Sequence, residues 1–261
     1  MISIKPVADS SMPQLHCVVQ RLDFLTNNIL RAIKKVATKL IRNQGDKMSD
    51  NNLRIWDKIA GAHESTIPLD FAGHIKHIDR AAKVVEVGCG YGRVMTYLSA
   101  LGFRNLMGID GSQEMLRRAQ DRGYEHLLRA SGANVPLPAN SVDLVVYIGT
   151  LSSVSKQDER IACFGEIRRI LRPNGHVIVR DFAITLSPRR LLRYIWFFLR
   201  GHNFGNFRSV EGIEFHHFRA KELRGLATQA GLRVVTLTEE QFTTMHGNRS
   251  LGLTLVATYE Q

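Results

Sequence analysis

The sequence predicts an α/β fold in which helices cover both faces of a mostly parallel, doubly wound sheet. From residue 83 onward, short apolar runs alternate with segments of helical periodicity. These apolar runs are continuous rather than alternating, as is typical of strands that are buried on both faces. A chain of 261 residues, 44% of them hydrophobic, suits one such domain with additions at its edges.

Residues 1–47 differ from the rest of the chain. They contain eight Lys and Arg and three Asp, and so carry +5 of the formal net charge of +11. Apolar residues recur every three or four positions from Leu15 to Val36, which predicts a long amphipathic helix between Pro13 and Gly45. We expect a basic N-terminal helical extension (1–47) before the main domain (48–261). Three roles of this helix remain open: packing on the domain, forming a dimer seam, or forming a basic surface arm.

Seven strands are predicted after this extension, at residues 83–87, 106–109, 127–130, 142–147, 176–180, 232–237 and 251–258. Helices are predicted at residues 91–100, 112–121, 156–171 and 220–230. No helix separates the last two strands, since residues 238–250 are polar and irregular. We therefore expect these two strands to pair antiparallel at one edge, which gives a mixed sheet.

Residues 182–218 form an insertion between the fifth strand and the last helix. Ser187, Pro188 and Gly201 are the start and stop signals of a helix. One arc of this helix is apolar, and the opposite side is basic and aromatic. We expect it to cap a pocket, with residues 201–208 as a mobile loop; docking on a membrane and contact with RNA are alternatives. The residues expected to meet the substrate are Arg189, Arg193, Trp196 and Phe197.

A strand, a glycine-rich turn and a helix follow one another at Val84-Val85-Glu86-Val87-Gly88-Cys89-Gly90-Tyr91-Gly92-Arg93. Glycine allows positive φ and a close approach of the backbone to a ligand. Asp110, at the end of the next strand, is placed to accept the hydroxyl groups of a ribose. Together these residues predict that an adenosine-type nucleotide binds over the first two strands.

The identity of the nucleotide depends on charge. The three glycines do not complete the dinucleotide pattern G-x-G-x-x-G, and no phosphate-binding lysine of the Walker type is present. Glu86, two residues before the first glycine, would repel a pyrophosphate and suits a cationic ligand. These features favour the sulfonium of S-adenosylmethionine over NAD or ATP.

On these residues the sequence resembles the class I S-adenosylmethionine-dependent methyltransferases, over about residues 52–260. The resemblance also covers the segments 132–138, 141–147 and 166–176, in the family's order. It implies a Rossmann-like, doubly wound, seven-stranded mixed sheet with the last strand antiparallel, and S-adenosyl-L-methionine as the cofactor. The family's acid before the fourth strand is replaced by Gly132, which leaves only main-chain contacts to the adenine there.

Carried onto this sequence, the resemblance implies a set of cofactor-binding residues. Trp56 is placed where members of the family close over the methionine part. The full set is Trp56, Glu86, Gly88, Cys89, Gly90, Gly92, Asp110, Gly111, Met115, Gly132, Ala133, Asn134 and Ile148.

The sequence names no certain general base for methyl transfer. His216, His217 and Tyr147 are candidates, and Asp181 at the end of the fifth strand is expected to orient the substrate. Residues 147–153 lack the (D/N)-P-P-(Y/F) tetrapeptide, which disfavours amino-group methylation of nucleobases or glutamine. No metal site is predicted, because the two histidines lack partners at useful spacing.

Three functions remain open on the sequence. The first is a methyltransferase that acts on oxygen or nitrogen of a small or medium-sized metabolite. The second is an RNA (tRNA) modification methyltransferase, because the region of the fourth strand resembles enzymes that esterify a carboxymethyl group on wobble uridine. The third is a non-catalytic adenosylmethionine-binding partner subunit.

Composition indicates which partners and which cellular compartment to expect for the protein. The charge of +11 favours acidic partners such as RNA or an anionic membrane surface, in addition to a small-molecule acceptor. Three widely spaced cysteines, with no signal-like segment and no run of eighteen apolar residues, lead us to expect a cytoplasmic protein with reduced thiols. The oligomeric state is open.

Overall fold

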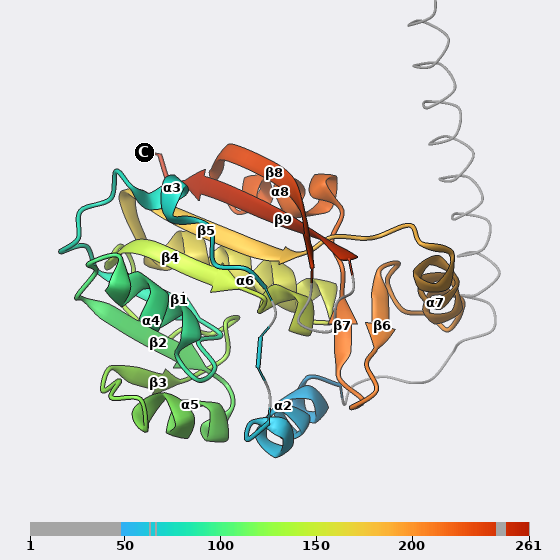
Figure 1. Cartoon of the computed structure of the whole chain (residues 1–261). Coiled ribbons are helices and arrows are strands. Elements are labelled where there is room, and N and C mark those ends of the chain that lie inside the picture. Colours follow the sequence, from blue (N-terminus) through green and yellow to red (C-terminus); the bar gives the residue numbers. More distant parts are fainter. Residues whose placement is uncertain (1–47, 63, 66, 244–248, 261) are drawn as a thin grey trace, which may run out of the picture.

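A computed structural model of the chain describes residues 48–62, 64–65, 67–243 and 249–260. The predicted N-terminal extension (1–47) lies outside the described residues. Seven strands form one sheet in the order β3-β2-β1-β4-β5-β9-β8, which Figure 1 shows from the side. The strands are β1 (Val84–Val87), β2 (Leu106–Asp110), β3 (Leu127–Arg129), β4 (Val142–Ile148), β5 (Leu171–Phe182), β8 (Arg233–Thr243) and β9 (Arg249–Thr258).

Strand β9 runs antiparallel to both of its neighbours, and the other pairings in the sheet are parallel. This confirms the predicted seven-stranded mixed sheet. The hairpin of β8 and β9 is longer than predicted, because polar residues 238–243 continue β8 at the edge of the sheet, where one face can remain solvated. Strand β5 also begins earlier than predicted, at Leu171.

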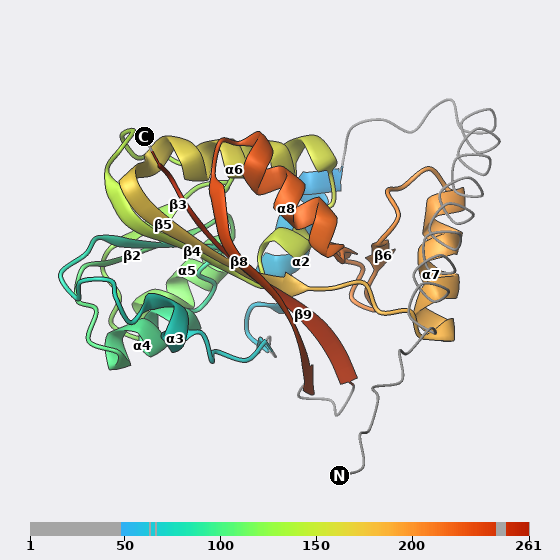
Figure 2. The ribbon, with the colours of Figure 1, turned by 90° about the horizontal axis from the view of Figure 1, so that it is seen from above.

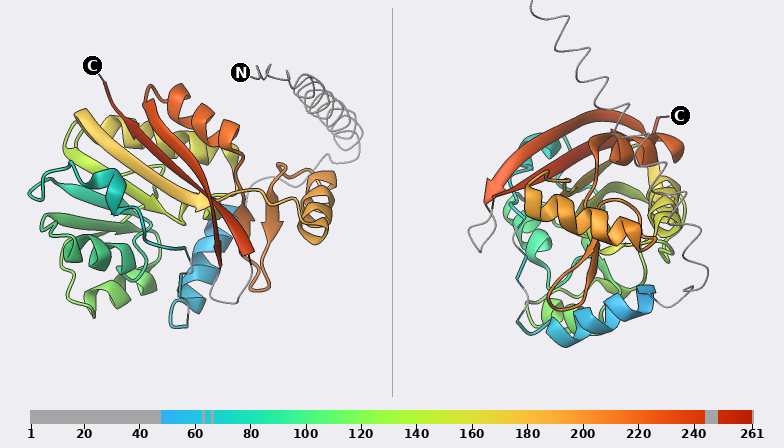
Figure 3. Two further views of the ribbon diagram at one scale, coloured as in Figure 1. Left: turned by 45° about the horizontal axis from the view of Figure 1, so that its top comes forward. Right: turned by 90° about the vertical axis from the view of Figure 1, so that its right-hand side faces the viewer.

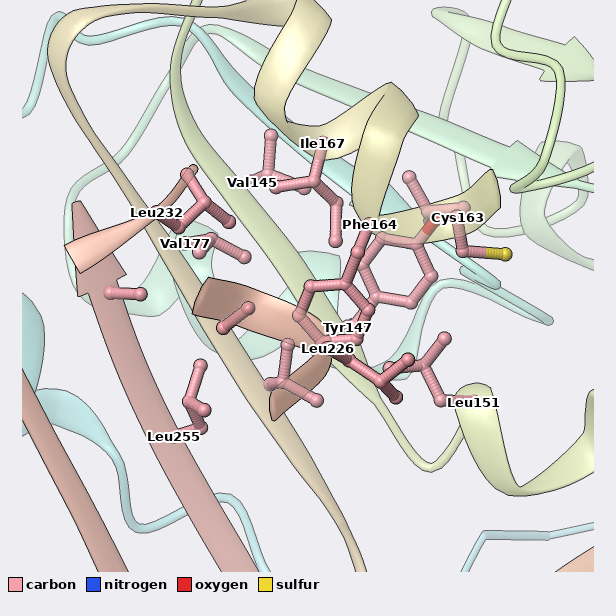
Figure 4. Close-up of a cluster of buried hydrophobic side chains, with 14 of the residues drawn as sticks. Val145, Tyr147, Leu151, Cys163, Phe164, Ile167, Val177, Leu226, Leu232 and Leu255 are labelled. Carbon is pink, nitrogen blue, oxygen red and sulfur yellow. The ribbon is translucent and has the colours of Figure 1, made fainter. Parts of the chain in front are cut away.

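Helices pack on both faces of the sheet, as Figure 2 shows from above. On one face α6 (Gln157–Ile170) and α8 (Ala220–Gln229) bury residues such as Phe164, Ile167 and Leu226 against the strands. Figure 4 shows this cluster, with Val145, Val177 and Leu255 of the sheet beneath the helices. The other face is covered by α3 (Ala72–Ile75), α4 (Arg93–Ala100) and α5 (Gln113–Gln120).

Local signals explain the ends of these helices. The Oγ of Ser112 accepts a hydrogen bond from the backbone N–H of Met115 at 3.1 Å, which caps α5 as predicted. Helix α4 begins at Arg93, two residues later than predicted, because the left-handed Gly92 precedes it. A short 3₁₀ turn, η1 (Leu151–Ser153), follows β4.

Helix α2 (Met48–Ile59) lies across the carboxyl ends of the parallel strands (Figure 1). The Nδ2 of Asn52 donates to the carbonyl oxygens of Ser153 and Glu214, each at 3.0 Å, and its Oδ1 accepts from the N–H of Glu214 at 3.0 Å. A single buried amide thus joins α2 to η1 and to the insertion.

The insertion forms α7 (Pro188–Leu199) and a two-stranded sheet of β6 (Asn206–Arg208) and β7 (Glu214–His216). Helix α7 confirms the predicted start and stop signals. The prediction of a mobile loop over 201–208 is wrong for its last part, because residues 206–208 pair with β7. Phe207 of β6 packs with Tyr194 and Phe197 of α7 in a small core of its own. No helix of the described residues is long and apolar enough to cross a membrane.

Candidate functional site

A cavity of about 230 Å³ opens at the carboxyl ends of β1, β2 and β4. The chain winds outward in both directions from the pair β1 and β4, so the strand order reverses there. Ligands of doubly wound sheets bind at such a switch point. The walls come from the turn after β1, the end of β2, the segment after β4 and helix α2. The cavity therefore lies where the glycine turn predicts a nucleotide.

The three glycines after β1 have left-handed backbones, with φ of 75° at Gly88, 52° at Gly90 and 83° at Gly92. At Gly90 the nearest atom to an added Cβ would be 3.9 Å away, in the open space of the cavity. An added Cβ would lie 2.2 Å from the Thr150 side chain at Gly88, and 2.7 Å from the Tyr124 ring at Gly92. Gly90 keeps space open for a ligand, whereas the other two glycines make room for the protein's own side chains.

Asp110 is held in place by two backbone amides. The N–H of Gly90 donates to its Oδ2 and the N–H of Ser112 donates to its Oδ1, both at 2.8 Å. Burial raises the pKa of Asp110, and these donors oppose the rise. Because each carboxylate oxygen accepts more than one hydrogen bond, the side chain can still accept from a ligand. A fixed carboxylate at this position suits the two hydroxyls of a ribose.

Glu86 lies beneath the turn, fully buried, and its Oε2 has no hydrogen-bond partner among the described residues. Burial raises the pKa of Glu86 well above its ordinary value, although the Arg93 guanidinium opposes the rise. Arg93 lines the same cavity and donates to the Oγ of Ser65 at 3.1 Å. An unpaired carboxylate beside a cation is complementary to the ammonium and carboxylate of an amino acid, so these residues fit the methionine part of S-adenosylmethionine.

Ten of the thirteen expected cofactor residues line the cavity: Trp56, Glu86, Gly88, Cys89, Gly90, Asp110, Gly111, Met115, Gly132 and Ile148. Gly92, Ala133 and Asn134 do not line it. The thiol of Cys89 is buried, which raises its pKa well above the ordinary value and makes it a packing group rather than a nucleophile.

The space around residue 132 explains why glycine stands there in place of the family's acid. An added Cβ at this residue would lie 2.6 Å from the hydroxyl oxygen of Tyr147. The same hydroxyl donates to the carbonyl oxygen of Gly132 at 3.3 Å. Tyr147 therefore fills the space that a side chain at residue 132 would need.

The structure separates the three candidate bases from the cavity, because none of them lines it. The hydroxyl of Tyr147 is buried, and burial raises its pKa well above the ordinary value. His216 bonds to Asn206 at 2.5 Å and to Glu222 at 2.8 Å through its two ring nitrogens. His217 is buried against Tyr194, with 2.7 Å between Nδ1 and the hydroxyl oxygen. All three candidate groups therefore have structural partners in the described chain and lie outside the wall of this cavity.

Asp181 is also absent from the cavity wall. Its carboxylate accepts from the backbone N–H of Ser152 at 2.9 Å and from that of Phe182 at 2.8 Å. Burial raises its pKa to about 6. Asp181 fixes η1, whose Ser153 lines the cavity, so its contribution to the site is indirect.

The structure places the four predicted substrate residues of the insertion away from the cavity. Arg189, Arg193, Trp196 and Phe197 all lie outside the cavity wall. Phe197 is buried under α7, and the guanidinium of Arg193 lies 4.1 Å from the centre of the Phe207 ring. The helix therefore packs beside the pocket rather than over it.

Several lining residues are missing from the predicted set of cofactor-binding residues. They are Asn52, Leu53, Ser65, Tyr91, Arg93, Thr150, Ser153, Val154, Ser155 and Glu159. For Arg93 a signal existed, since it is the cation next to the last glycine of the turn. The others depend on how α2 and the segment after β4 meet in space. In the described part of the chain, no group of three or more His, Cys, Asp or Glu is arranged to hold a metal ion.

Comparison with known proteins agrees with this geometry. A family model described as "Methyltransferase domain" matches residues 85–179, from β1 into β5. A solved S-adenosylmethionine-dependent methyltransferase from Methanosarcina mazei superposes with a TM-score of 0.68 at 22% identity, over 74% of this chain and 99% of that chain. This likeness establishes the fold.

Two curated relatives are similar over about half of the chain. The tRNA (carboxymethyluridine(34)-5-O)-methyltransferase alkbh8 of Xenopus tropicalis is 26% identical over 140 residues, 52% of this chain and 22% of that protein. The 27-O-demethylrifamycin SV methyltransferase of Amycolatopsis mediterranei is 27% identical over 157 residues, 56% of this chain and 57% of that protein. The first relatives are matched over only 20% to 34% of their own lengths.

The fold, the glycine turn with its two flanking acids and the matching family model lead to one conclusion. The chain contains a methyltransferase domain with the fold of the class I S-adenosylmethionine-dependent methyltransferases, and its cofactor is S-adenosylmethionine.

Proposed function

We propose that this protein transfers the methyl group of S-adenosylmethionine to an oxygen or nitrogen atom of a small or medium-sized metabolite. The observation that carries the proposal is the lining of the cavity. One set of lining residues, Glu86, Arg93 and Asp110, is charged and matches the cofactor. A second set, from α2 and the segment after β4, is mostly uncharged and can enclose a small acceptor.

The residues of the first set fix the cofactor at its two ends. Glu86 would accept from the ammonium of the methionine part and Arg93 would donate to its carboxylate, while Asp110 would accept from the ribose hydroxyls. When bound, S-adenosylmethionine would supply a methyl group on a positive sulfur, and this sulfur would leave as a neutral thioether when the acceptor atom bonds to the methyl carbon. The protein's main contribution is therefore to position the two reactants and to exclude water.

Glu159 is the lining carboxylate, among the described residues, that this cofactor arrangement leaves unused. It lies in the first turn of α6, and the Nζ of Lys156 is 3.7 Å from its Oε1. We assign to Glu159 the task of accepting the proton of an acceptor hydroxyl or ammonium group. Replacement by Gln should lower kcat by about 10²- to 10⁴-fold and leave cofactor affinity unchanged.

The matched control for this variant is Asp158→Asn. Asp158 occupies the same helical turn but is exposed and does not line the cavity. Its kcat should equal that of the unchanged protein. Equal loss in both variants would mean that the charge of α6, rather than the Glu159 carboxylate, affects the reaction.

RNA methylation is the second candidate, and the similarity to the Xenopus tropicalis tRNA-modifying enzyme favours it. Against it, Arg93 is the only Lys, Arg or His among the described lining residues, and the cofactor accounts for it. An RNA substrate brings phosphates to the rim of the cavity, where cations would be expected.

The acceptor class can be tested by incubating the full chain with methyl-labelled S-adenosylmethionine and a cell extract. The extract is then separated into small molecules, RNA, protein and lipid. Label in the small-molecule fraction is the expected result. Label in RNA would support the second candidate, and cofactor binding without transfer to any fraction would support a non-catalytic subunit.

A further inference from the structure

Helix α7 presents an apolar stripe to solvent. Leu192, Trp196 and Leu199 are four and three residues apart, so they share one face of the helix. They are 68%, 48% and 48% exposed, and Leu186 just before the helix is 71% exposed. The other exposed large apolar side chains of the described residues lie singly on separate elements. A grouped apolar stripe of this kind marks a contact surface.

The inner face of α7 is fixed by specific contacts, so the helix cannot simply roll to bury the stripe. Tyr194 is buried and bonds to His217, and the Nη2 of Arg190 donates to the Oγ of Ser250 at 3.2 Å. Arg193 packs over the ring of Phe207. The exposed face of α7 is therefore a stable feature of this fold.

Basic residues border the stripe. Residues 183–210 contain five arginines and no acidic residue. Arg189 and Arg200 are exposed, and the guanidinium of Arg200 lies 3.7 Å from the centre of the Trp196 ring. Leucines that enter a lipid layer, with Trp and Arg at the level of the headgroups, form the pattern of helices that lie in a membrane interface.

We propose that the outer face of α7 docks on an anionic lipid surface. Leu192, Trp196 and Leu199 enter the boundary between headgroups and acyl chains, and Arg189 and Arg200 contact lipid phosphates. Helix α7 lies beyond the carboxyl ends of the parallel strands, where the cavity opens (Figure 1), and at the front of the molecule in the right-hand view of Figure 3. Docking therefore holds this end of the sheet close to the membrane.

Charge argues against the other occupants of this face. A symmetric contact with a second copy would bring the arginines of both helices together. Residues 1–47 of this chain carry +5 and would also meet like charge. RNA phosphates would pair with the arginines but would leave the leucines exposed to water. An anionic lipid surface satisfies both the apolar and the basic residues.

Vesicle binding by the full chain tests the proposal without reference to enzyme activity. The probes are vesicles of phosphatidylcholine alone and of phosphatidylcholine with phosphatidylglycerol. We expect co-sedimentation with the second kind, weakened by salt. Leu192→Gln/Leu199→Gln should reduce it on the order of tenfold, because two apolar side chains no longer enter the lipid. The matched control is Ile161→Gln/Val235→Gln, which removes two exposed apolar side chains of α6 and β8 and should leave binding unchanged.

The fluorescence of Trp196 reports directly whether the outer face of α7 contacts lipid. The chain has two tryptophans, so Trp56→Phe leaves Trp196 as the sole reporter. Its emission should shift to the blue when anionic vesicles are added. An unshifted emission, or equal vesicle binding by the double variant and its control, would overturn the proposal. Two results with the Leu192→Gln/Leu199→Gln protein would also overturn the proposal. One is a change of oligomeric state, and the other is a loss of tRNA binding while vesicle binding stays intact.

Discussion

The turn after β1 and the insertion between β5 and α8 hold their functional side chains in different ways. In the turn, backbone N–H groups fix the geometry, as when those of Gly90 and Ser112 hold the Asp110 carboxylate. In the insertion, side chains from distant segments decide which face of α7 is buried, as when His217 binds Tyr194. A site held by backbone groups can be inferred from a sequence motif, whereas a helix face chosen by side-chain partners cannot.

The largest effect should come from closing the space at Gly90. Gly90→Val places a branched side chain in the cavity, and we expect S-adenosylmethionine binding to be lost in isothermal titration. Gly123→Val is the matched control, because Gly123 also has positive φ, at 89°, and open space around it, but does not line the cavity. Loss of binding in both variants would point to backbone strain instead of ligand space.

Asp181 lies between the two regions, where β5 ends and the insertion begins, and its carboxyl should make stability depend on pH. Its pKa of about 6 in the folded protein is higher than the roughly 3.9 of an unfolded chain. The proton bound by the folded state therefore stabilises it below pH 4, and this contribution is lost as the pH rises through 6. Relative to Asp181→Asn, the free energy of unfolding should fall by about 2 kcal/mol between pH 4 and 7, measured by urea titration. If the two proteins differ by the same free energy of unfolding at pH 4 and at pH 7, the pKa of Asp181 is not raised in the folded state.

Asp110→Ala should weaken cofactor binding by about 1.5–3 kcal/mol, because charge-assisted hydrogen bonds to the ribose are lost. Asp121→Ala removes an exposed carboxylate near the end of α5, and its affinity should be unchanged. Unaltered binding in a folded Asp110→Ala protein would remove the ribose assignment.

The smallest effect is expected in the insertion. Arg189→Gln/Arg200→Gln should leave the KM for a soluble acceptor within about twofold, because exposed charges contribute roughly 0–1 kcal/mol and these lie outside the cavity wall. A large rise in KM would show that α7 does meet the acceptor, as the sequence alone suggests. Steady-state kinetics with the identified acceptor makes the measurement.

Most of the fold could be predicted because its signals are local. Continuous apolar runs mark β1, β4 and β5, and the absence of a helix between β8 and β9 indicates their antiparallel pairing. The cofactor residues follow from the turn and from Asp110. What the motifs could not predict is Asn52, which reaches the cavity from α2, although the resemblance to the family did point to Trp56 on the same helix.

The sequence by itself determined the sheet, its strand directions and the glycine turn that lines the cavity, because strand burial and glycine conformation depend on neighbouring residues. Only the tertiary structure decided where the other polar side chains lie and which groups they bond to. His216, His217 and Tyr147 found buried partners instead of the cavity. Helix α7 presents Leu192 and Leu199 to solvent because Tyr194 and Phe197 pack against Phe207. A stacked or hydrogen-bonded arginine can lie on the inner face of a helix, where periodicity predicts an apolar residue.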